Sequence, residues 1–168
     1  LTDSNGNWSH TLLTALADGA HTVTATPTGG QSSQDLVLTV DTTSGALGIA
    51  KLASASDSGA SATDGITNLS QVLITGVGGE AGATIQALIG SLIVGRATVV
   101  ADGTYRITAQ GLTDGVNNVV LKQTDLAGNT SSATGTASVQ VTYKSSVLAP
   151  TIAGLTAATN SGVPGDNI

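Results

Sequence analysis

The sequence predicts an all-β protein, and three observations favour that class. Thr, Ser, Gly, Ala and Val dominate the 168 residues, whereas residues that helices prefer on their surfaces are scarce, with Glu80 as the one glutamate. Hydrophobic residues make up 40% of the chain, which is too apolar for a disordered tail, so the chain should fold. The aromatic residues are Trp8, Tyr105 and Tyr143 alone, so the core must consist mainly of Val, Ile, Leu and Ala.

Short apolar runs bounded by Gly, Asp and Asn predict seven strands at the spacing typical of a β-sandwich. They cover residues 49–55, 71–76, 83–88, 92–100, 105–109, 117–124 and 133–141. In the last run, Val139 and Val141 alternate with polar neighbours, as in a half-buried strand. Gly90-Ser91 between the third and fourth runs predicts a tight hairpin. Seven antiparallel strands in about 100 residues predict an immunoglobulin-like β-sandwich.

The sequence repeats itself with a period of about 100 residues, which indicates a tandem array. Asn5-Gly6-Asn7-Trp8 resembles Asp102-Gly103-Thr104-Tyr105, and Leu16-Ala17-Asp18-Gly19 resembles Leu112-Thr113-Asp114-Gly115 at nearly the same separation. We therefore expect residues 1–40 to be the C-terminal part of a preceding repeat, 41–145 a complete repeat, and 146–168 the start of the next. The incomplete repeats would leave open sheet edges, which we expect to self-associate between molecules or to be poorly ordered.

Charge and composition exclude several classes of function. The net charge is -6 with five Lys and Arg residues, so a nucleic-acid backbone would find little to neutralise it. The longest apolar run, residues 87–95, is about half of what a membrane-spanning helix needs, and we expect no membrane insertion of this segment. His10 and His21 both lie outside the complete repeat, which therefore holds no Ser-His-Asp set, and we expect no enzyme activity.

The chain has no Cys, so disulfide bonds cannot stabilise it. A domain with few large side chains needs another stabilising cross-link, and bound metal is the obvious candidate. Alternate loops of an immunoglobulin-like sandwich gather at opposite ends, and nearly all acidic residues of the complete repeat fall in such loops. Ca²⁺ takes about six to eight oxygen ligands, from carboxylates, Asn and backbone carbonyls. The sequence thus predicts Ca²⁺ at the two ends of the sandwich, its poles. Alternatively, the aspartates and Asp-Gly pairs only shape turns at these ends and bind no metal. One pole would hold Asp41, Glu80, Asp102, Asp125 and Asn129, and the other Asp57, Asp64 and Asp114.

Several short motifs in the same order resemble the bacterial Ig-like repeats of giant biofilm-associated surface adhesins of the Bap and RTX type. They are Asp57-Ser58-Gly59, Asp64-Gly65-Ile66-Thr67, Gly79-Glu80-Ala81-Gly82-Ala83, Asp102-Gly103-Thr104-Tyr105, Leu112-Thr113-Asp114-Gly115 and Thr124-Asp125-Leu126-Ala127-Gly128-Asn129. The resemblance implies a calcium-stabilised extender module, exported to the cell surface and repeated many times in a stalk. The sequence departs from the family pattern at Ala81, where Pro is usual, and at Tyr105, where Trp is usual. It also departs at residues 26–31, which lack a carboxylate equivalent to Asp125.

We therefore expect a mechanical role outside the cell, in which the module holds a distant adhesive domain away from the bacterial surface. Its partners would be the neighbouring repeats of the same chain. The competing hypothesis is that the module is itself adhesive and binds a glycan, a matrix protein or an ice surface. Because Tyr105 is expected in the core, the complete repeat offers no aromatic platform for such a ligand, which favours the spacer.

Overall fold

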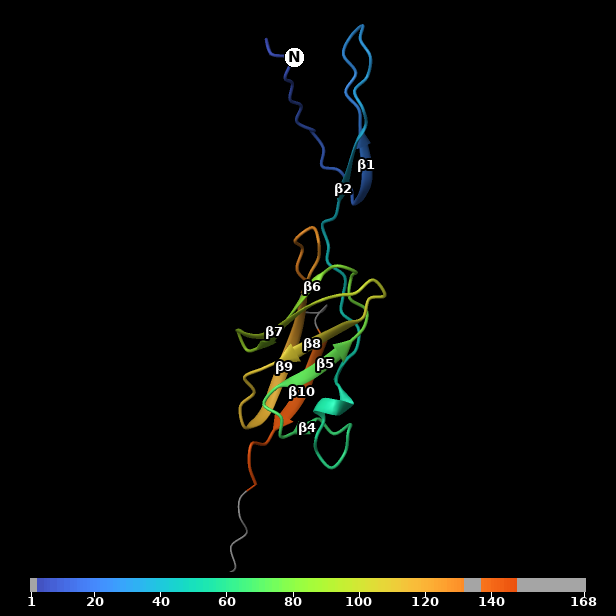
Figure 1. The fold of residues 1–168 in the computed structure, drawn as a ribbon. Coiled ribbons are helices and arrows are strands. Elements are labelled where there is room, and N and C mark those ends of the chain that lie inside the picture. The colour runs from blue at the N-terminus through green and yellow to red at the C-terminus, as the bar shows by residue number, and fades with distance from the viewer. Residues whose placement is uncertain (1–2, 132–136, 148–168) are drawn as a thin grey trace, which may run out of the picture.

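The computed structural model describes residues 3–131 and 137–147, which form a β-sandwich preceded by a separate hairpin (Figure 1). The larger sheet contains, in spatial order, β4 (Ile66–Thr67), β10 (Ala137–Tyr143), β9 (Gly115–Thr124), β6 (Thr84–Ile89) and β7 (Leu92–Thr98). The smaller sheet contains β3 (Ala50–Leu52), β5 (Val72–Gly76) and β8 (Tyr105–Ala109). Neighbouring strands of the sandwich are antiparallel except for β4 and β10, which pair in parallel.

The core lies between the two sheets and follows from the period-two alternation of the strands. In β8, Tyr105, Ile107 and Ala109 are buried while Arg106 and Thr108 are exposed. The other strands contribute the same small aliphatic types to one cluster, which is the core that the composition predicted.

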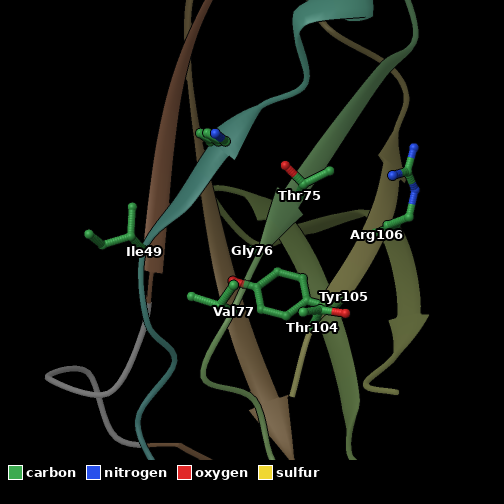
Figure 2. Close-up of a pocket in the computed structure, with 8 residues that line it drawn as sticks. Ile49, Thr75, Gly76, Val77, Thr104, Tyr105 and Arg106 are labelled. Atoms are coloured by element: carbon green, nitrogen blue, oxygen red, sulfur yellow. The ribbon is translucent and has the colours of Figure 1, made fainter. Parts of the chain in front are cut away.

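Tyr105 is the aromatic residue of this core, and its ring fits there because the neighbouring strand has a glycine beside it. Its ring lies against Gly76, the residue paired with it across β5 and β8 (Figure 2). A Cβ atom on Gly76 would overlap the ring Cζ and the phenolic oxygen. The hydroxyl group is buried and has no hydrogen-bond partner within the described ranges. Burial raises the pKa of the Tyr105 phenol above its ordinary value.

The structure confirms the all-β, immunoglobulin-like sandwich and shifts several of the predicted strand ends. The first predicted strand ends at Leu52 because Ser54–Ser56 form a 3₁₀ turn. The two-residue strand β4 was not predicted. The hairpin turn at Gly90 is confirmed, with a φ of 61° that favours glycine.

Part of the seventh predicted strand, residues 133–136, lies outside the described residues, as do residues 148–168 of the expected third repeat. No helix in the described part of the chain is long and apolar enough to cross a membrane.

The hairpin before the sandwich consists of β1 (Gly19–Val23) and β2 (Leu36–Val40), which form a two-stranded sheet of their own. Its register matches that of β9 and β10. Gly19 at the start of β1 pairs with Val40 at the end of β2, and Gly115 at the start of β9 pairs with Tyr143 at the end of β10. Both glycines have a positive φ, 125° and 103°, so the two strands begin with the same kind of turn.

A side-chain contact is also repeated at the exit of each hairpin. Asp18 stands before Gly19 and accepts hydrogen bonds from the amide (3.2 Å) and the hydroxyl (2.9 Å) of Thr42, two residues after β2. Asp114 stands before the equivalent glycine and accepts hydrogen bonds from the amide and the hydroxyl of Ser145, both at 2.7 Å, two residues after β10. Equivalent aspartates, Asp18 and Asp114, therefore hold the chain at the same point after each hairpin.

Candidate metal centre

Three carboxylates from separate segments meet at the end of the sandwich where the chain arrives from the hairpin. Asp41 directly follows β2, Glu80 lies between β5 and β6, and Asp125 directly follows β9. One carboxylate oxygen of each lies within 4.8 Å of the others. Asp125 is buried, Glu80 is half-buried and Asp41 is exposed, so the group opens toward solvent on the linker side.

The backbone around Glu80 is positioned by the buried side chain of Gln123. The Glu80 amide donates a hydrogen bond to Gln123 Oε1 at 2.8 Å. The Nε2 atom of Gln123 reaches the linker, at 3.3 Å from Ser44 Oγ and 3.4 Å from the Gly45 carbonyl. The Gly45 amide in turn donates to Glu80 Oε1. A Cβ on Gly45 would lie 2.6 Å from that oxygen, so a larger residue here would displace the Glu80 carboxylate.

Sequence reasoning missed Gln123, although the strand pattern contains a signal for it. Gln123 is two residues beyond Leu121 and four beyond Val119, so it occupies an inward-facing position of β9. A polar residue at such a position needs internal hydrogen-bond partners. Those partners are the linker and the Glu80 loop, and Gln123 therefore ties the two together.

Asp125 closes its own loop through Asn129. Its two carboxylate oxygens accept hydrogen bonds from the Asn129 amide at 2.8 Å and from the Asn129 side-chain Nδ2 at 2.9 Å. Burial acts to raise the pKa of Asp125, but the Asn129 bonds and further backbone amides hold it below its ordinary value. The same Nδ2 atom donates to the Asp41 carbonyl at 3.0 Å. Asn129 thus links the linker segment to the Asp125 loop.

The donor set fits a hard divalent cation. All the clustered atoms are carboxylate oxygens, and the nearby Asn129 side chain and linker carbonyls are further oxygen donors, the type that Ca²⁺ and Mg²⁺ prefer. Oxygens bound to one Ca²⁺ at about 2.3–2.6 Å can lie up to about 5 Å apart. The observed limit of 4.8 Å falls within that span. Asp41, Glu80 and Asp125 could therefore hold one metal ion.

Asp102 was predicted at this pole, and the structure leaves it out of the group. Its Oδ1 atom accepts hydrogen bonds from the Thr104 amide at 2.9 Å and the Thr104 hydroxyl at 2.7 Å, which lower the pKa of Asp102. Its side chain therefore shapes the turn before β8, as the alternative reading of Asp-Gly turns describes.

The residues predicted at the opposite pole do not form a comparable group within residues 3–131 and 137–147. Asp57 is buried and accepts a hydrogen bond from the Gly65 amide at 3.1 Å, while its other carboxylate oxygen has no partner there. Asp64 accepts a hydrogen bond from the Ile66 amide at 3.0 Å. Asp114 holds the amide and hydroxyl of the chain leaving β10, as described above, and these bonds lower its pKa.

Comparison with known families agrees with this architecture. The family described as "Bacterial Ig-like domain" matches residues 45–142, so the chain belongs to that family. Among solved structures, the chain is similar to one titled "Biofilm associated protein - BSP domain", at 13% sequence identity and a TM-score of 0.40. That match covers 79% of this chain and 20% of the other, so this chain spans about a fifth of that protein. A search of curated proteins finds no match.

Proposed function

We propose that residues 41–145 form a spacer module of a bacterial cell-surface adhesin, and that Ca²⁺ held by Asp41, Glu80 and Asp125 stiffens its junction with a preceding repeat. The position of the three carboxylates carries the proposal. Asp41 belongs to the segment that leaves β2, whereas Glu80 and Asp125 belong to loops of the sandwich. A cation shared by them would hold that segment against the sandwich.

The repeated hairpin supports a tandem arrangement of such modules. The β1–β2 hairpin and the β9–β10 hairpin share their register, their initial glycine and the aspartate that holds the exiting chain. A preceding repeat that ended in this way would deliver its last strand directly to Asp41. In this alignment Lys144 after β10 takes the place of Asp41 after β2, so the three-carboxylate group belongs to the junction that precedes this module.

The residues of the chain prepare this site, and the ion supplies the charge that they lack. Like charges within 4.8 Å repel one another, so without a cation the three carboxylates would oppose close contact between linker and loops. Gln123 and Asn129 nevertheless hold the linker there through hydrogen bonds to uncharged groups. Bound Ca²⁺ supplies a compensating double positive charge, and its binding free energy adds to the stability of the folded junction.

Amide hydrogen exchange at the linker tests this proposal. We expect saturating Ca²⁺ to slow exchange at the Gly45 amide, which donates to Glu80, relative to the chain in EDTA. The variant Glu80→Gln should lose this Ca²⁺ response. The matched control is Asp102→Asn, which removes a carboxylate outside the group and should keep it. Equal protection of Gly45 with and without Ca²⁺ would contradict the proposal.

A further inference from the structure

Four of the five basic residues lie on the two outer faces of the sandwich, in one row across each sheet. Three of the acidic residues, by contrast, gather at the pole next to the linker. This separation of charge gives an acidic molecule two broad sides that are locally basic.

On the smaller sheet, Lys51, Thr75 and Arg106 form one row across β3, β5 and β8. Lys51 pairs with Thr75, and Thr75 pairs with Arg106. Lys51 and Arg106 are exposed and flank the half-buried Thr75. Two strand spacings of about 4.8 Å place the two basic positions about 9.5 Å apart along the row.

A hollow of about 480 Å³ runs along this row and is bordered by side chains suited to a sugar (Figure 2). Ile49 and Val77 border it, 84% and 51% exposed, and offer apolar surface to the C–H face of a sugar ring. Thr75 and Thr104 offer hydroxyls to sugar hydroxyls. The lining of this hollow contains no acidic residue; a second hollow beside it includes the buried Asp57.

The larger sheet carries an equivalent row on its outer face. Lys122 of β9 and Arg96 of β7 both pair with Gln86 of β6, which lies between them. Both basic residues are exposed, and Gln86 is half-buried. Each sheet therefore presents the same pattern of Lys, a neutral hydrogen-bonding residue, and Arg.

We propose that the two outer faces bind linear anionic polysaccharide, one strand of polymer on each face, with Lys51 and Arg106 on one side and Lys122 and Arg96 on the other. The anion must be sparse along the polymer, because the whole chain carries a net charge of -6 and repels a densely charged polymer. A carboxylated polysaccharide provides separated anions together with hydroxyls and apolar ring faces. With one strand on each face, a single module cross-links two polymer strands.

The charge pattern favours a polysaccharide over a second copy of this chain. Two copies packed side by side would bring basic rows against basic rows. The clustered carboxylates of a second copy lie at its pole, where Asp41, Glu80 and Asp125 face each other. An extended polymer, by contrast, can lie across a flat sheet face without meeting those acidic ends.

The test is a titration of the chain with short hyaluronan oligosaccharides, which carry carboxylates, at low ionic strength. Dextran serves as the uncharged control polymer. Dextran sulfate serves as the control polymer that carries sulfate groups in place of carboxylates. We expect a stoichiometry of two hyaluronan oligosaccharides per chain and none for dextran. The double variant Lys51→Ala/Arg106→Ala and the double variant Arg96→Ala/Lys122→Ala should each reduce the stoichiometry to one, and the fourfold variant should abolish binding.

The two double variants control for each other, because each removes two exposed charges from one sheet and leaves the other sheet intact. Lys144→Ala removes a basic residue beyond β10 and should leave binding unchanged. The melting temperatures of all variants should match that of the parent chain, since the substituted side chains are exposed. Binding that survives in the fourfold variant, equal binding of dextran, or no binding of hyaluronan would each overturn the proposal. So would self-association of the chain that the fourfold variant abolishes, because the occupant would then be a second copy.

Discussion

Replacing Gly76 by Ala tests how the sandwich accommodates its buried aromatic ring. The added Cβ would overlap three atoms of the Tyr105 side chain, which is only 2% exposed. Overpacking a core costs about 1–3 kcal/mol, and loss of a whole buried aromatic side chain costs about 3–5 kcal/mol. Because the added Cβ is fixed to the β5 backbone and the Tyr105 ring is buried, we expect a loss of about 3 kcal/mol, where the two ranges meet.

Urea denaturation at equilibrium measures this loss, and a second background identifies its cause. For a domain of about 100 residues, a loss of about 3 kcal/mol lowers the melting temperature by roughly 12–24 °C. In a Tyr105→Ala background the ring is gone, and Gly76→Ala should then cost less than about 1 kcal/mol, the span of strand propensities. If Gly76→Ala costs the same in both backgrounds, the ring is not the reason for the glycine and the reasoning is refuted.

Three further predictions follow from single contacts. Tyr105→Phe removes a buried hydroxyl that lacks a partner in the described structure, so it should stabilise the sandwich by about 1–3 kcal/mol in urea denaturation; a loss of stability would show that the hydroxyl is satisfied. Gln123→Ala leaves the Glu80 amide without its acceptor, so it should destabilise by at least about 1–3 kcal/mol and weaken Ca²⁺ binding measured by calorimetry; unchanged affinity would contradict its positioning role. The hydrogen bonds from Ser145 lower the pKa of Asp114 below its ordinary value of 3.8, so their stabilisation is present above that pH and lost as the pH falls through the lowered pKa. An NMR titration of the Ser145 amide should show this loss, and Ser145→Ala should move the pKa of Asp114 upward; no movement would contradict the assignment.

The fold was predictable from the sequence because its signals are local. Alternating residues such as Val139 and Val141 identify a half-buried strand without any knowledge of its neighbours. Strand β4 could not be found in this way, because it has two residues and exists through its parallel pairing with β10. The end of the first predicted strand was misplaced because residues 54–56 turn where their composition is still compatible with a strand.

The candidate metal centre was predictable in part. The connectivity of the sandwich brings the loops of Glu80 and Asp125 to the end where Asp41 enters, and the structure places these three together. Asp102 lies in the loop between β7 and β8, but its carboxylate accepts hydrogen bonds from the hydroxyl and the amide of Thr104 in that loop. Asp125 is also bound within its own loop by Asn129 and still faces Asp41 and Glu80, so the difference depends on side-chain geometry, which spacing alone does not contain.

The most direct test of a calcium-stiffened junction is the melting temperature of the chain across a Ca²⁺ titration that starts in EDTA, with Mg²⁺ as the control ion. At a Ca²⁺ concentration about one hundred times the Kd, binding to the folded state alone adds about 2.7 kcal/mol of stability. For a domain of this size we therefore expect a rise of roughly 10–20 °C, which Asp125→Asn should abolish and Asp102→Asn should preserve. A melting temperature that does not change with Ca²⁺ would contradict the account and leave the acidic loops as turns only.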